Sequence, residues 1–189
     1  MAEINLVPQD AVSFEEFSQF ARRRGWEIDQ RSVRAARHEE SPEFLWRAGG
    51  DATVRLVQSA TLDRSYLVVA GDDPGPSADA VREEFPTFSL AEIVERLAVA
   101  RSDEDRRAAL RLVAATGASS FDQTIYDAVR GGLEDSDSLV RLAALAAAFY
   151  LRWHQFRPLV ERVSESPEAG ENIRIIAGDL LGLTHWDRG

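Results

Sequence analysis

A segment that recurs three times in the second half of the chain constrains the fold more than any other feature. Each copy places an arginine after an acidic turn and before small or apolar residues, and the copies span 105–110, 140–145 and 173–178. The three arginines, Arg106, Arg141 and Arg174, stand 35 and 33 residues apart. A repeat of this length indicates a supersecondary unit that buries its apolar face only against neighbouring copies.

An amphipathic helix is expected before each copy, at 90–99, 121–133 and 156–163. Ser89 and Glu92 have the spacing of a capping box, in which each side chain accepts a hydrogen bond from the other residue's backbone N–H. The spacing therefore predicts that the helical region begins at about Ser89. From there to the end, the sequence predicts about three helix pairs.

The segment 133–144, with its acidic turn, its Val140-Arg141 pair and its alanine-rich helix, resembles the signature of HEAT-like repeats such as those of bilin lyases. The first copy keeps the arginine without the valine, and the third begins Ile173-Arg174. The resemblance covers about half of the chain and implies a short α-solenoid. It also implies that Arg106, Arg141 and Arg174 form a structural ladder, each pairing with the acidic turn of its own or the adjacent repeat. The whole chain resembles small bacterial immunity and adaptor proteins with an α+β head and a HEAT tail.

Residues 1–88 show a mixed pattern that predicts an α+β domain. Ser13 and Glu16 form a second capping-box pattern at the start of a phenylalanine-rich helix. Strands are expected at 4–7, 44–46, 53–57 and 66–70, and a short helix at 78–85 after the Gly/Pro-rich loop 71–77. Close strand spacing favours a small antiparallel sheet with the helix packed on one face. The expected domains are therefore an α+β domain at 1–88 and a repeat domain at 89–189.

Composition excludes several classes of function. The chain has no cysteine, which excludes disulfides and zinc–thiolate sites, and its net charge is −10. A nucleic acid or an anionic membrane attracts a positive surface, so neither is an expected partner. All 22 basic residues are arginine, a bias typical of GC-rich bacterial genomes. The N-terminus lacks a signal-peptide pattern and no apolar run approaches the ~20 residues of a membrane span, so a cytoplasmic protein is expected.

Enzyme motifs are scarce. The histidines, His38, His154 and His185, are scattered without ligand spacing, and no phosphate-binding loop or nucleophile motif is present. We therefore expect no catalytic, metal-binding or cofactor residues, and we interpret the chain as a non-enzymatic protein-interaction module. Two alternatives stay open: an enzyme on a HEAT-like scaffold, similar to bilin lyases, and a small ligand bound by the N-terminal domain.

The candidate partner-binding residues fall into an acidic group and an aromatic group. The acidic turns would form a rim for a partner with a basic patch, and they contain Asp103, Glu104, Asp105, Glu134, Asp135 and Asp137. The alternative is that these carboxylates cap helices or simply face water. Tyr150, Trp153 and His154 are candidates for an aromatic anchor, although Tyr150 and Trp153 fit the core equally well. Phe149 and Phe156 are expected to be core.

Overall fold

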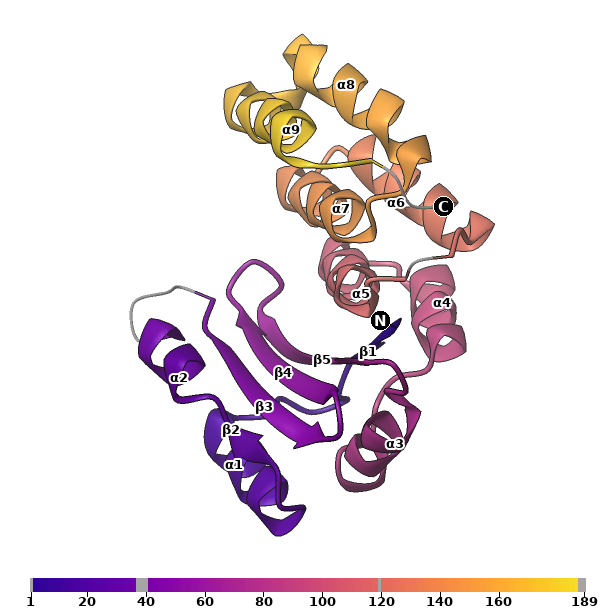
Figure 1. Cartoon of the computed structure of the whole chain (residues 1–189). Coiled ribbons are helices and arrows are strands. Elements are labelled where there is room, and N and C mark those ends of the chain that lie inside the picture. Colours follow the sequence, from indigo (N-terminus) through magenta and orange to yellow (C-terminus); the bar gives the residue numbers. More distant parts are fainter. Residues whose placement is uncertain (1, 37–40, 119, 187–189) are drawn as a thin grey trace. The chain divides into compact units, whose positions relative to one another are not determined.

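The computed structural model describes residues 2–36, 41–118 and 120–186 of the chain, and His38 therefore lies outside the described residues. The chain divides into two compact units, Met1–Phe88 and Ser89–Gly189 (Figure 1). Each unit has its own core, and the two are described separately.

The first unit is built on a five-stranded antiparallel sheet, which confirms the predicted α+β class. Its strand order is β1-β5-β4-β3-β2, with β1 Ala2–Leu6, β2 Glu27–Ile28, β3 Glu43–Gly49, β4 Ala52–Ser59 and β5 Arg64–Gly71. The four longer strands match the expected ones. The sequence did not reveal β2, because two residues are too few to show strand alternation.

The unit packs its helices against one face of the sheet. Cross-strand register aligns Trp46 with Val54 and Val54 with Val69, so these side chains share that face. Helices α1 (Phe14–Arg23) and α3 (Gly75–Glu84) contribute to the same core. At its centre the rings of Phe17 and Trp46 meet edge to face, 4.8 Å between centroids. The expected packing of a phenylalanine-rich helix on the sheet is confirmed.

Two helices of this unit differ from expectation. Helix α3 begins at Gly75, three residues before the expected start, with Pro74 and Pro76 at its N-terminus. Proline is tolerated in the first turn because its missing N–H would have had no intrahelical acceptor. Helix α2 (Gln30–Ala36), beside β3, was not expected, because seven residues hold too little apolar periodicity. The capping box of Ser13 and Glu16 at the start of α1 is confirmed.

The second unit consists of helices that pair in chain order. They are α4 Leu90–Val99, α5 Asp103–Thr116, α6 Gln123–Leu133, α7 Ser138–Leu151, α8 Arg157–Glu165 and α9 Glu171–Leu183, with short 3-10 turns at His154–Phe156 and Pro167–Ala169. Figure 1 shows two rows, α4, α6 and α8 in one and α5, α7 and α9 in the other, and neighbours within a row are in contact. The capping box of Ser89 and Glu92 is confirmed. In the described part of the chain, no helix combines the length and apolarity needed to cross a membrane.

A glycine permits the close approach of α6 to the other row. A Cβ atom added at Gly132 would lie 2.9 Å from Cβ of Ala144 on α7 and 3.0 Å from Cδ1 of Leu110 on α5. The neighbouring Gly131 faces open space, with no atom within 4 Å of its Cβ position. The helix interface therefore requires glycine at 132 and tolerates a side chain at 131.

We expect Gly132→Ala to destabilise the protein by about 1–3 kcal/mol, because the added methyl group overpacks the junction of three helices. Gly131→Ala is the matched control, and alanine at that exposed helical position should stabilise by about 0.5–1 kcal/mol. Urea unfolding of both variants measures the difference. Equal effects of the two substitutions would contradict the close packing at Gly132.

Candidate functional site

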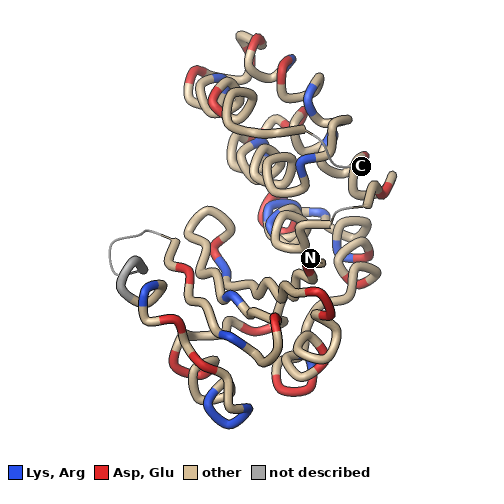
Figure 2. The backbone as a smooth tube through the Cα atoms, viewed as in Figure 1, with Lys and Arg blue, Asp and Glu red and all other residues tan. Residues whose placement is uncertain are grey.

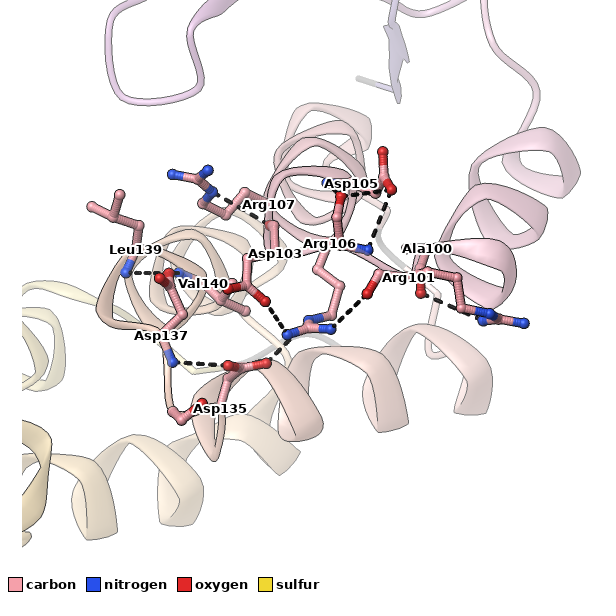
Figure 3. A network of polar contacts seen from close by, with 12 residues as sticks. Ala100, Arg101, Asp103, Asp105, Arg106, Arg107, Asp135, Asp137, Leu139 and Val140 are labelled. Carbon is pink, nitrogen blue, oxygen red and sulfur yellow. Dashed lines mark hydrogen bonds and ion pairs between the residues drawn. The ribbon is translucent and has the colours of Figure 1, made fainter.

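Arg106, in the first turn of α5, connects two consecutive helix pairs (Figure 3). Its Nη2 pairs with the carboxylate of Asp103, and its Nε lies 3.1 Å from Oδ2 of Asp135, an ion pair without the geometry of a hydrogen bond. Asp135 belongs to the turn between α6 and α7, and its side chain is only 13% exposed. The guanidinium therefore ties the start of α5 to the next acidic turn.

The neighbouring carboxylates serve helix termini. Asp137 accepts hydrogen bonds from the backbone N–H groups of Leu139 and Val140 at 2.9 and 2.8 Å, which caps α7. Asp105 forms a capping box with Ser102 at the start of α5. Hydrogen bonds from the Ser102 hydroxyl and backbone N–H lower the pKa of the Asp105 carboxyl from its ordinary value of 3.8.

Several of the acids expected to form a rim make contacts within the unit, and the acidic rim stays a prediction. Asp135 is not available to a partner, because it is mostly buried against Arg106. Asp103, Asp105 and Asp137 are held by contacts within the unit. Asp103, Glu104, Asp105 and Glu134 are exposed, and Glu134 forms a solvent-exposed pair with Arg162 at 3.2 Å. The acids of the turns act first as caps and ties.

The three aligned arginines have different surroundings. Arg106 meets two carboxylates, whereas Arg141 donates to backbone carbonyl oxygens, at 2.7 Å to Asp135 and 3.4 Å to Ala169. Arg174 is exposed, and its side chain has no partner among the described residues. The last turn is built differently, because a 3-10 turn and Gly170 at a positive φ of 82° precede α9. The expected carboxylate ladder therefore exists at Arg106 alone within the part of the chain described.

Trp153 is a core residue, which corrects its assignment as a candidate partner anchor. It is fully buried, and its Nε1 donates to the carbonyl oxygen of Ala118 at 2.9 Å. Its ring stacks on Phe156, 5.4 Å between centroids. Arg152 adopts the left-handed conformation at the C-terminus of α7, and the chain turns there. His154 is exposed beyond this turn, and Tyr150 is half-buried on α7.

An uncharged apolar stripe, which sequence reasoning only partly found, faces outward from α7. Leu139, Leu142, Ala146 and Phe149 are spaced three or four residues apart along one helix face, and Tyr150 lies next to Phe149 at its edge. Leu139 is 49% exposed, and the others are half-buried. The one charged residue of α7 is Arg141, so α7 is almost uniformly tan in Figure 2. Phe149, which was expected in the core, is only half-buried and so is partly accessible to solvent.

Helix α9, which contacts α7, also exposes apolar side chains. Three apolar side chains of α9 are exposed, with exposed fractions of 55% for Ile175, 38% for Ile176 and 73% for Leu183. Helical spacing places Asp179 among them, and its carboxylate makes no ion pair with the described residues. We call the outward residues of α7 and α9 together the second-helix face. The aligned positions of α5 carry Glu104, Arg107 and Arg111, so the apolar character belongs to α7 and α9.

A shallow depression of about 520 Å³ lies on the first unit and could admit a small ligand. Ser65 and Ser59 line it, but their hydroxyl oxygens accept backbone hydrogen bonds from Val12 at 3.0 Å and Leu62 at 3.2 Å. These serines hold the loops of the unit together. Among the described residues, no group of histidines and carboxylates is arranged to hold a metal ion.

No protein-family model, curated protein or solved structure matches the chain.

Arg106→Gln should destabilise the protein by about 1–3 kcal/mol, because the mostly buried Asp135 carboxylate loses its guanidinium. Arg174→Gln is the matched control at the aligned, exposed position and should change stability by less than about 0.5 kcal/mol. Urea unfolding midpoints compare the two. An Arg106→Gln protein as stable as wild type would show that the ion pair contributes nothing to the packing of the helix pairs.

The capping carboxylate of Asp105 should make part of the stability depend on pH. Its pKa is lowered in the folded protein, so its contribution is present above the ordinary value of 3.8 and is lost as the pH falls through the folded value. Asp105→Asn keeps the shape and removes the titration. The stability difference between wild type and this variant should shrink as the pH falls from about 5 to about 2.5, an interval that brackets the ordinary pKa of 3.8. A difference independent of pH would contradict this role.

Proposed function

We propose that the protein is a non-enzymatic protein-interaction module of the bacterial cytoplasm, an immunity-type inhibitor or an adaptor. In this proposal the second unit is a short HEAT-like α-solenoid that binds a protein partner along the second-helix face. The observation that carries the proposal is the uncharged apolar stripe of α7, together with the exposed apolar side chains of the neighbouring α9.

The stripe supports binding because a surface helix ordinarily turns polar residues to water. On α7 the outward positions are apolar along the length of the helix, from Leu139 to Tyr150. On α9, Ile175 and Leu183 are more than half exposed. Contiguous exposed apolar residues on a soluble domain are typical of a protein interface. Repeat stacks also commonly bind partners along one continuous row of helices.

Repeat-equivalent contacts support the HEAT-like part of the proposal. Nη1 of Arg106 donates to the carbonyl oxygen of Arg101, five residues earlier, at 3.4 Å. Nη1 of Arg141 donates to the carbonyl oxygen of Ser136, again five residues earlier and again at 3.4 Å. The two turns thus share a backbone contact as well as a sequence pattern, as expected of copies of one unit.

The charges near the face favour an apolar partner surface that carries a basic group. Asp179 stands among the exposed apolar residues of α9, and a cation of the partner would neutralise it there. The net charge of −10 and the exposed Glu104 and Glu134 would speed the approach of such a partner. This steering is screened by salt, since the Debye length is about 8 Å at physiological ionic strength.

Leu139→Glu and Ile175→Glu should each weaken partner binding at least tenfold, because each places a charge within the buried centre of the interface. Both side chains are about half exposed, so folding should be unaffected. Leu90→Glu on α4 is the matched control, because Leu90 is 44% exposed and lies outside the face. A partner recovered with wild-type protein from native lysate should be lost with the first two variants and kept with the third. Retention by all three would place the interface elsewhere.

A further inference from the structure

Arg106 and Arg141 occupy aligned positions, but the same edge of the guanidinium is used differently. In Arg106 the edge formed by Nε and Nη2 faces carboxylates, those of Asp135 and Asp103. In Arg141 the Nε–H is buried with no hydrogen-bond acceptor, and Nη2 has only a long contact, 3.4 Å, to the carbonyl oxygen of Ala169. An arginine carries five N–H donors, and this edge is the one that binds a carboxylate through two parallel hydrogen bonds.

The repeat itself explains why this edge of Arg141 lacks a carboxylate. Ser138 stands where the first repeat has Asp103. The position aligned with Asp135 in the next turn is Glu168, which is exposed and makes no ion pair among the described residues, and the backbone oxygen of Ala169 contacts Nη2 instead. In the first repeat, carboxylates of the chain itself therefore pair with the arginine. In the second repeat the positive charge of Arg141 has no carboxylate partner among the described residues.

A cavity of about 270 Å³ adjoins Arg141 between α6, α8 and the turn before α9. Its apolar wall is formed by buried side chains, namely Leu133, Leu159, Val163 and Ala169. Arg130 and Arg162 also line it, and they pair with Asp127 at 3.0 Å and Glu134 at 3.2 Å. A cation at one end and aliphatic groups along the wall suit a small molecule with one carboxylate and a short apolar body.

We propose that this cavity is a binding site for a small aliphatic monocarboxylate, whose carboxylate occupies the Nε–Nη2 edge of Arg141 as Asp135 and Asp103 occupy that of Arg106. The apolar body of the acid lies against Leu159 and Val163. The other lining carboxylates do not compete strongly: Asp135 and Glu134 are paired with Arg106 and Arg162. Glu168 is exposed at the rim and makes no ion pair among the described residues. This site is separate from the second-helix face and does not rest on the proposed function.

Calorimetric titration of the full-length protein tests the site with isovalerate, hexanoate and the neutral isostere isovaleramide. Isovalerate should bind at least tenfold more tightly than isovaleramide, because only the acid can neutralise Arg141. Arg141→Gln should abolish the preference, whereas Arg174→Gln, at the aligned exposed position, should leave it intact. Ser166→Leu keeps Arg141 and narrows the cavity from its rim, so it should weaken hexanoate binding even if Arg141→Gln proves unstable.

Any of three results would overturn the proposal. Isovalerate and isovaleramide could bind equally well, the acids could fail to bind, or Arg141→Gln and Ser166→Leu could both leave the affinity for the acids unchanged. A peptide that ends in valine with a free carboxylate, compared with its amidated form, distinguishes the source of the carboxylate. Binding of the free peptide without binding of isovalerate would assign the site to a protein C-terminus and overturn the small-acid proposal.

Discussion

The second unit depends on the burial of α7 among its neighbours. Helix α7 contacts α5, α6 and α9, and the side chains it turns toward them include four buried alanines, Ala143, Ala144, Ala147 and Ala148. Small side chains let helix axes approach closely, and Gly132 extends the same principle to α6. With α7 enclosed by packed helices in this way, the outward stripe that begins at Leu139 is its remaining surface. Its apolar character is the physical basis of the proposal that a partner covers it.

The charged residues of the repeat turns serve the architecture. Asp105 and Asp137 satisfy backbone N–H groups at the starts of α5 and α7, which a helix cannot satisfy internally. Arg106 and Asp135 join one turn to the next through a pair that is largely withdrawn from water. Many of the carboxylates in these turns thus stabilise the fold. In the proposed complex, exposed acids such as Glu104 would influence the rate of encounter more than the strength of binding.

Aligned positions in a repeat can diverge in chemistry while keeping their geometry. Arg106 and Arg141 each donate a hydrogen bond to the backbone carbonyl oxygen five residues earlier in the chain. Only Arg106 also has carboxylate partners among the described residues. Around Arg141, Ser138 replaces the aligned Asp103, and the aligned acid Glu168 is exposed and makes no ion pair among the described residues. Arg141 lies beside a cavity that is lined in part by aliphatic side chains. The arginine that ties two turns together in one repeat is, in the proposed site, a binding group in the next.

Local signals in the sequence determined much of the architecture. The capping boxes at Ser13 and Ser89 predicted helix starts, and the spacing of the arginines predicted paired helices, because caps and periodicity act over a few residues. Tertiary structure decided which side chains are accessible. Trp153 is buried because the chain turns at Arg152, and Asp135 is withdrawn from solvent because Arg106 comes to it from another helix pair. Such contacts join residues about thirty positions apart through the packing of whole helices, so no local pattern encodes them.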